Sequence, residues 1–141
     1  HDWHLTIVGI GTVPLALSLD DLLRLPQQTV TATLDCTGGW YTTQRWRGVR
    51  VADVFALAGP VREARSFTAE SVTGYRRRFP LAALEEYVLA THVNGELLSH
   101  GHGAPLRLVA PGRRGYDWVK WLTALYLNDS GPWRQALLPL Q

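Results

Sequence analysis

Short runs of β-type residues that end at glycine- or proline-containing turns are the feature that most constrains the fold of this chain. Residues 88–93 and 96–98 flank Asn94-Gly95, a dipeptide typical of a two-residue hairpin turn. Further β-type segments cover residues 3–11, 30–35, 66–79 with a turn at Thr73-Gly74, 104–110 and 118–127. This distribution predicts an α+β fold, a β-rich mixed domain rather than a doubly wound parallel sheet.

The helical patterns are few and short. Ser18 begins a capping box, residues 50–58 carry apolar side chains at helical spacing, and residues 80–87 predict a short helix with proline in its first turn. A chain of 141 residues is long enough for one domain with its own core and too short for two ordinary ones. We therefore expect residues 1–141 to form a single domain, excised from a longer chain because it begins without methionine.

Charge and composition narrow the class of function. The 46% hydrophobic and 18% charged composition excludes a disordered chain, and a net charge of +2 gives no support for nucleic acid as a partner. Lys120 is the single lysine, so the basic residues are mostly arginines, which suit recognition of oxyanions. We expect both Arg76-Arg77-Arg78 and Arg113-Arg114 to face solvent. Of the two, only Arg113-Arg114, in the loop before Lys120, is a candidate for contacting a cofactor or steering an anionic substrate.

Cys36 is the only cysteine, and it lies where the predicted strand 30–35 meets Gly38-Gly39. It has three interpretations. A lone thiol is often a buried apolar side chain; it serves as a nucleophile when an imidazole such as that of His92 or His102 is near; or it binds a soft or high-valent metal centre as a thiolate.

Four motifs follow one another along the chain: Cys36-Thr37-Gly38-Gly39-Trp40, Trp46-Arg47-Gly48-Val49, His102-Gly103-Ala104-Pro105-Leu106-Arg107 and Val119-Lys120-Trp121-Leu122. In this order they resemble the molybdopterin-binding domain of the sulfite oxidase family, the bacterial members in particular. The resemblance extends from about Leu5 to Leu127. It favours the third interpretation of Cys36 and implies molybdopterin as the cofactor.

The resemblance also implies a role for individual residues. Cys36 is then the protein's ligand to molybdenum, and Gly38 and Gly39 let the backbone approach a bulky cofactor. His102, Arg107 and Lys120 hold the pterin and its phosphate, because a buried anion needs fixed cationic donors. Thr73 falls where the family has a polar contact to the cofactor.

The chain departs from the family pattern next to the motif cysteine. Animal and plant sulfite oxidases carry a substrate-binding arginine five residues after it, where this chain has Tyr41. Arg45 or Arg47 would have to replace that arginine from a shortened loop. We therefore take Tyr41 and Arg45, together with Cys36, as the candidate catalytic residues.

The implied activity is a two-electron oxygen-atom transfer on a small oxyanion or an S- or N-oxide. The alternative is a non-catalytic cofactor-binding or electron-transfer module of the same fold. By the same resemblance, a haem-containing membrane segment or a cytochrome is the expected redox partner. The expected location is extracytoplasmic, either periplasmic or attached to a membrane.

Overall fold

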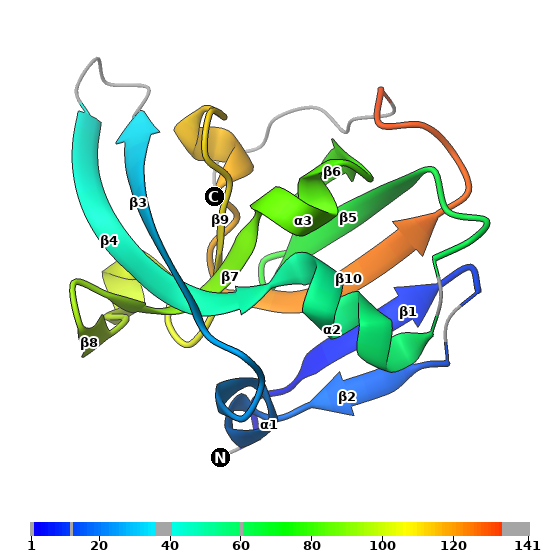
Figure 1. The fold of residues 1–141 in the computed structure, drawn as a ribbon, viewed down its shortest axis with the longest axis horizontal. Coiled ribbons are helices and arrows are strands. Elements are labelled where there is room, and N and C mark those ends of the chain that lie inside the picture. The colour runs from blue at the N-terminus through cyan, green and yellow to red at the C-terminus, as the bar shows by residue number, and fades with distance from the viewer. Residues whose placement is uncertain (1, 12, 36–40, 60, 134–141) are drawn as a thin grey trace.

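Two β-sheets with short helices between and beside them make up the protein (Figure 1). The computed structural model describes residues 2–11, 13–35, 41–59 and 61–133. This arrangement confirms the predicted β-rich α+β class. Within the described ranges, no helix is both long and apolar enough to span a bilayer.

The first sheet has the strand order β2-β1-β10-β5-β6. Its strands are β1 (Leu5–Gly9), β2 (Leu15–Leu17), β5 (Ser66–Ser71), β6 (Arg76–Pro80) and β10 (Leu122–Asn128). The central strand β10 runs parallel to β1 and antiparallel to β5. Segments from the two ends of the described chain therefore meet in the middle of one sheet.

The second sheet has the order β3-β4-β7-β8, and β9 also pairs with β7. Its strands are β3 (Gln28–Asp35), β4 (Tyr41–Arg50), β7 (Val88–Val93), β8 (Glu96–Leu97) and β9 (Arg107–Val109). The predicted hairpin turn is present, with Asn94 at φ 51° and Gly95 at φ 88°. These values suit a type I′ turn, which explains the preference for asparagine and glycine there.

The helices are short, as the sequence predicts. They are α1 (Leu19–Leu23), α2 (Val51–Ala58), α3 (Ala83–Glu86) and two 3₁₀ turns, η1 (His100–His102) and η2 (Gly115–Asp117). The capping box of α1 is formed: the Asp21 amide donates to Ser18 Oγ, and the Ser18 amide donates to Asp21 Oδ2.

A row of aromatic rings joins the helices to the first sheet. Phe55 of α2 packs edge-on against Phe67 of β5 with ring centroids 6.0 Å apart. Phe67 lies 5.3 Å from Phe79 of β6, which lies 5.4 Å from Tyr87. Since α2 begins directly after β4, this row fixes the second sheet relative to the first.

The hairpin of β3 and β4 extends beyond the rest of its sheet. Pairing of β4 with β7 begins at Trp46, so residues 41–44 of β4 are paired with β3. Closer to the core, β4 and β7 approach each other tightly, since a Cβ on Gly48 of β4 would lie 1.8 Å from the carbonyl oxygen of Leu89 in β7. Only glycine fits at that position, next to an irregularity in the β4–β7 register.

Three details differ from the predictions. Strand β4 was not predicted, although it is the longest strand of the described chain. Pro80 ends β6 instead of opening a helix, and α3 begins at Ala83. Residues 118–121 precede β10 rather than belonging to it, so Lys120 lies in a connecting segment.

Candidate cofactor and substrate site

Two of the motif segments lie side by side. The Leu108 amide donates to the Val119 carbonyl at 2.8 Å, and the Leu122 amide donates to the Leu106 carbonyl at 3.0 Å. The Trp121 amide donates to the Gly103 carbonyl at 3.3 Å. The backbone thus aligns the segment that carries Lys120 with the segment that carries His102 and Arg107.

Gly103 allows the predicted cofactor-binding residues to come together. It adopts φ 103°, and a Cβ there would lie 3.0 Å from Cβ of Lys120 and 3.1 Å from Cβ of Arg107. A larger residue would be strained in conformation and would push these two side chains away. His102, Arg107 and Lys120 are therefore neighbours, as the resemblance implies.

Arg107 is a buried cation, with 2% of its surface exposed. Its Nη1 donates to the His102 carbonyl at 3.0 Å and its Nη2 to the Trp118 carbonyl at 3.2 Å. Its guanidinium carbon lies 5.1 Å from the centre of the Trp46 ring and 5.8 Å from that of Trp118. These contacts hold a positive charge at a fixed place inside the protein.

Trp46 also touches His102, with ring centroids 6.4 Å apart. It is 1% exposed, and its Nε1 has no hydrogen-bond partner among the described residues. Native proteins rarely leave a buried donor in this state, so its presence next to Arg107 suggests that a ligand accepts its hydrogen bond.

His102 and Thr73 have defined local partners. His102 Nδ1 lies 2.8 Å from Ser99 Oγ, the side chain that caps η1. Thr73 is exposed in the β5–β6 turn, where its Oγ1 lies 3.1 Å from Ser71 Oγ. The preceding amide, that of Val72, donates to the Trp121 carbonyl at 2.8 Å. The turn that carries Thr73 therefore borders the Lys120 segment.

A cleft of about 450 Å³ lies between β3 and the loop that follows β9. We call it the basic cleft. It is lined by Thr31, Ala32, Thr33, Pro111, Gly112, Arg113 and Arg114. The sequence singles out this arginine pair as candidates for cofactor or substrate contact, and the structure places both at the cleft. Strand β3 ends at Asp35, so the basic cleft borders the strand that leads to Cys36.

An ion-pair network fixes the loop beside the basic cleft. Asp117 accepts from Arg77 Nε at 2.7 Å and from Arg113 Nη1 at 3.3 Å. Arg113 Nε also donates to the Tyr87 hydroxyl at 3.1 Å. Arg77 is 8% exposed, so the prediction that Arg76-Arg77-Arg78 all face solvent is wrong for this member. Alternation along β6 places Arg77 on the buried face with Phe79.

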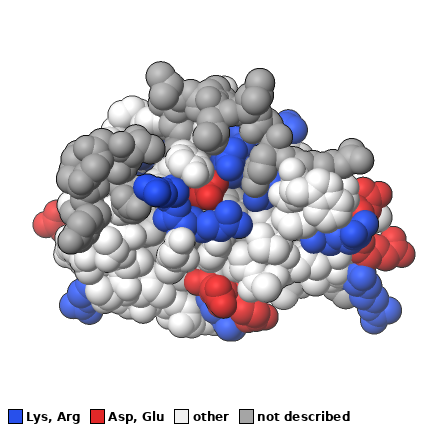
Figure 2. Space-filling model, turned by 90° about the horizontal axis from the view of Figure 1, so that it is seen from above, with Lys and Arg blue, Asp and Glu red and all other residues white. Residues whose placement is uncertain are grey.

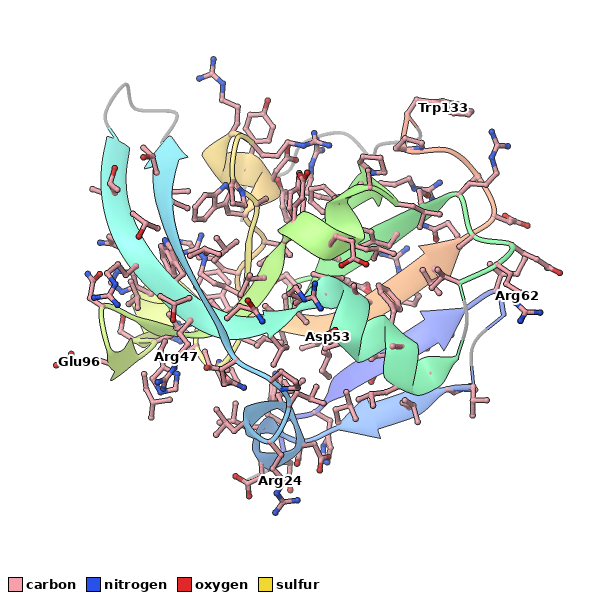
Figure 3. All side chains as sticks on the ribbon, in the orientation of Figure 1. Arg24, Arg47, Asp53, Arg62, Glu96 and Trp133 are labelled. Atoms are coloured by element: carbon pink, nitrogen blue, oxygen red, sulfur yellow. The ribbon has the colours of Figure 1, made fainter. Side chains whose placement is uncertain are left out.

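Of the three candidate catalytic residues, the structure describes the side chain of Arg45 alone. Cys36 lies outside the described residues, and so does the side chain of Tyr41, whose backbone belongs to β4. Arg45 is exposed, and alternation along β4 places it on the face opposite Trp46. Arg47 shares the face of Arg45, and Figure 3 shows it near β8, away from η2. The described residues therefore bring His102, Arg107 and Lys120 together without Arg45.

His92 lies on this opposite face, paired with Arg47 across β4 and β7. Burial lowers the pKa of His92 below its usual value of 6.5, and the Arg47 charge lowers it further. A depressed folded-state pKa makes the neutral imidazole favour folding. This contribution to stability is present above pH 6.5 and is lost as the pH falls toward the folded-state pKa.

We therefore expect His92→Gln to reduce the loss of unfolding free energy on acidification between roughly pH 7 and pH 5. Urea denaturation at several pH values measures this slope. Arg47→Gln should act in the same direction but less strongly, because the charge is the smaller cause of the shift. An unchanged slope in His92→Gln would contradict the prediction.

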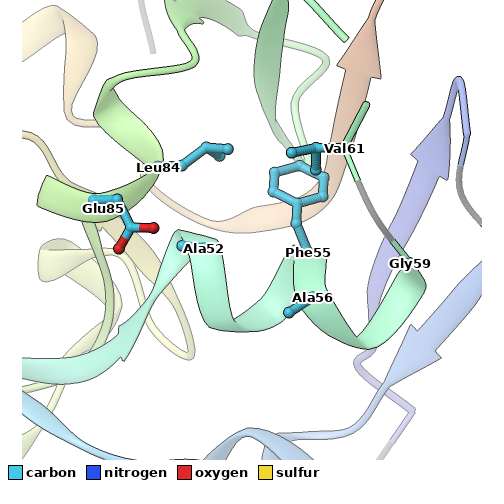
Figure 4. A pocket seen from close by; sticks show the side chains of 7 residues that line it. All are labelled: Ala52, Phe55, Ala56, Gly59, Val61, Leu84 and Glu85. Atoms are coloured by element: carbon cyan, nitrogen blue, oxygen red, sulfur yellow. The ribbon is translucent and has the colours of Figure 1, made fainter. Parts of the chain in front are cut away.

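A second pocket, of about 320 Å³, lies between α2 and α3 (Figure 4). Its lining residues are Ala52, Phe55, Ala56, Gly59, Val61, Leu84 and Glu85. The charged member, Glu85, accepts a hydrogen bond from Arg50 Nη1 at 3.0 Å. This pocket brings together none of the residues for which the sequence suggests chemistry.

The buried guanidinium of Arg107 and the neighbouring indole of Trp46, whose Nε1 has no hydrogen-bond partner among the described residues, together suit a domain that binds an anionic organic cofactor. The chain belongs to the family described as the oxidoreductase molybdopterin binding domain, whose model matches residues 1–133. Molybdopterin is therefore the cofactor of this domain.

Proteins from different organisms are similar to the chain. Mitochondrial sulfite oxidase of Rattus norvegicus is 37% identical over 152 residues, which cover 85% of this chain and 28% of that protein. The uncharacterized oxidoreductase YuiH of Bacillus subtilis is 31% identical over 139 residues, 94% of this chain and 70% of that protein. The chain thus spans little more than a quarter of the rat enzyme.

A solved structure confirms the fold. The crystal structure of the sulfane dehydrogenase SoxCD from Paracoccus pantotrophus superimposes with a TM-score of 0.86 at 32% sequence identity. The match covers 92% of this chain and 39% of that one. The relatives are named for different sulfur substrates, sulfite and sulfane, so the family by itself leaves the substrate open.

Proposed function

We propose that this domain catalyses a two-electron oxygen-atom transfer on a small oxyanion or an S- or N-oxide, with molybdopterin as its cofactor. The observation that carries the proposal is the buried Arg107, held against Trp46 beside His102 and Lys120. A guanidinium fixed at this place suits the phosphate of the cofactor, because charge-assisted hydrogen bonds to an oxyanion are among the strong ones.

Each residue of the site would have its own role. The cofactor supplies the metal that exchanges oxygen and electrons with the substrate. Arg107, with its guanidinium fixed by two carbonyls, would hold the phosphate, and Lys120 would add a second positive charge. Trp46 Nε1 would donate to the pterin. Cys36 would be the protein ligand of the metal.

The position of His102 suits it to orient the cofactor. Ser99 Oγ contacts its Nδ1 and sets the direction of the ring, which leaves Nε2 as the nitrogen to face a ligand. The Trp46 ring lies edge-on against the imidazole and limits its rotation. His102 would therefore bind the pterin through a preset ring rather than a mobile one.

Cofactor analysis combined with turnover tests the proposal. Protein produced in a host that makes molybdopterin is expected to contain close to one molybdenum per chain. With a redox dye as electron acceptor or donor, it should oxidise or reduce at least one of sulfite, a sulfoxide and nitrate. Molybdenum-loaded protein that turns over none of them would favour the non-catalytic module instead.

The redox partner and the location are part of the same proposal. We propose a haem-containing membrane segment or a cytochrome as the partner, and an extracytoplasmic location. Reduction of a purified c- or b-type cytochrome by the loaded protein during turnover would support the partner, and fractionation of the native host would test the location.

A further inference from the structure

We propose that the basic cleft recognises an anionic substrate through Arg113, and that Asp117 is the positioning residue that holds Arg113 there. The proposal deepens the proposed function and rests on it, because it selects the oxyanions among the possible substrates. Among the described residues that line the cleft, two are arginines and none is acidic. Such a lining attracts anions and gives no advantage to neutral S- or N-oxides.

Arg113 is held in place from three sides. Its Nη1 donates to Asp117, its Nε donates to Tyr87, and its guanidinium carbon lies 5.4 Å from the centre of the Phe79 ring. Nη2 is the remaining donor group, and 35% of the side chain is exposed. A guanidinium fixed in this way offers a ligand a donor that loses little freedom on binding.

Asp117 is itself fixed by the protein interior. Its side chain is 4% exposed and accepts from Arg77, whose side chain is 9% exposed. The Arg77 guanidinium carbon in turn lies 5.5 Å from the centre of the Tyr116 ring. Arg77 thus fixes the Asp117 carboxylate, and this carboxylate in turn holds Arg113 at the surface of the cleft.

Among the described residues at the cleft, positive charges outnumber negative ones. One carboxylate, that of Asp117, is shared by Arg77 and Arg113, and Arg114 adds another cation to the lining. Figure 2, which views the molecule from above, shows several blue side chains gathered around a small red area in the upper half of that face. The cleft lies beside β3, which ends at Asp35, one residue before the proposed metal ligand in the sequence.

Sulfate is the probe for the site, because it is an oxyanion that the proposed reaction does not consume. Isothermal titration of the molybdenum-loaded protein is expected to show sulfate binding, weakened about tenfold in Arg113→Gln because one charged hydrogen bond is lost. Arg62→Gln serves as the control, since Arg62 is exposed and points away from η2 in Figure 3. It should bind sulfate like the wild type.

Asp117→Asn distinguishes a role of the carboxylate in positioning Arg113 from a purely electrostatic effect of its charge on sulfate. Removal of a negative charge would by itself strengthen sulfate binding, whereas the loss of a positioning carboxylate should weaken it, by about threefold or more. Tyr87→Phe frees Arg113 Nε without a charge change and should weaken binding in the same direction. It keeps the test valid if Asp117→Asn does not fold.

Kinetics distinguish this inference from the proposed function. With an oxyanion substrate, Arg113→Gln should raise KM while kcat stays within about twofold, because a binding interaction is lost. Unaltered sulfate binding and KM in Arg113→Gln, or tighter sulfate binding in Asp117→Asn, would overturn the inference even if the enzyme is active. A wild-type protein that binds sulfate in this pattern without turnover would instead overturn the proposed function.

Discussion

Arg107→Met is expected to purify with less than about a tenth of the wild-type molybdopterin, because the cofactor loses a charge-assisted partner worth about 1.5–3 kcal/mol per hydrogen bond. Methionine keeps an unbranched apolar side chain between Trp46 and Trp118 and removes the charge. Molybdenum by mass spectrometry and oxidised pterin by fluorescence measure the occupancy.

The cofactor-free form should respond differently to the same substitution. Burial of a guanidinium is costly, so its loss offsets part of the lost hydrogen bonds to the two carbonyls. We expect the unfolding free energy of cofactor-free Arg107→Met to lie within about 2 kcal/mol of the wild type. The loaded protein should lose the extra stability that the cofactor gives to the wild type.

A matched control separates this effect from a general effect of charge. Arg24→Met changes an exposed arginine at the C-terminal end of α1, with 78% of its side chain accessible. It should load cofactor like the wild type. Normal molybdopterin content in Arg107→Met would contradict the role assigned to the buried guanidinium.

Cys36→Ser is expected to lower the rate of oxygen-atom transfer by at least about a thousandfold, which corresponds to about 4 kcal/mol in the activation free energy. A serine hydroxyl has nearly the shape of the thiol, but it is rarely deprotonated and donates poorly to a soft or high-valent metal. Steady-state kinetics on equal amounts of protein, normalised to pterin content, measure the loss.

Alkylation of the wild-type protein, together with the activity of Cys36→Ser, separates two interpretations of the thiol. If Cys36 binds molybdenum, cofactor loading should protect it from alkylation by iodoacetamide, and removal of the cofactor should expose it. Activity within tenfold of the wild type in Cys36→Ser would exclude a metal-ligand role. Equal alkylation of loaded and cofactor-free protein would do the same.

Local signals in the sequence predict much of the fold, since they depend on the backbone more than on distant partners. The Asn94-Gly95 hairpin and the Ser18 capping box form as predicted. Strand β4 was missed because its inward residues Thr42 and Gln44 are polar, and they are half-buried in a hairpin that extends beyond its sheet. The polar inner face hides the alternation that normally reveals a strand.

Local sequence patterns predict some residues of the site and miss others. The order of the motifs predicts His102, Arg107 and Lys120 as site residues, and in the structure they are neighbours. The pair of Arg77 and Asp117 was missed, because 40 residues separate them along the chain and no local pattern connects two such positions. The one available signal was the alternation of Arg77 with Phe79 on β6.

The parallel pairing of β1 with β10 has a consequence for how the polypeptide is made. The first sheet lacks its central strand until residues 122–128 have left the ribosome. Strand β1 therefore stays without its partner β10 until most of the chain has been synthesised. Long-range pairing of this kind slows folding. During synthesis, the apolar face of β1 is therefore exposed to chaperones and to aggregation for longer than that of the β3–β4 hairpin, whose strands are neighbours in sequence.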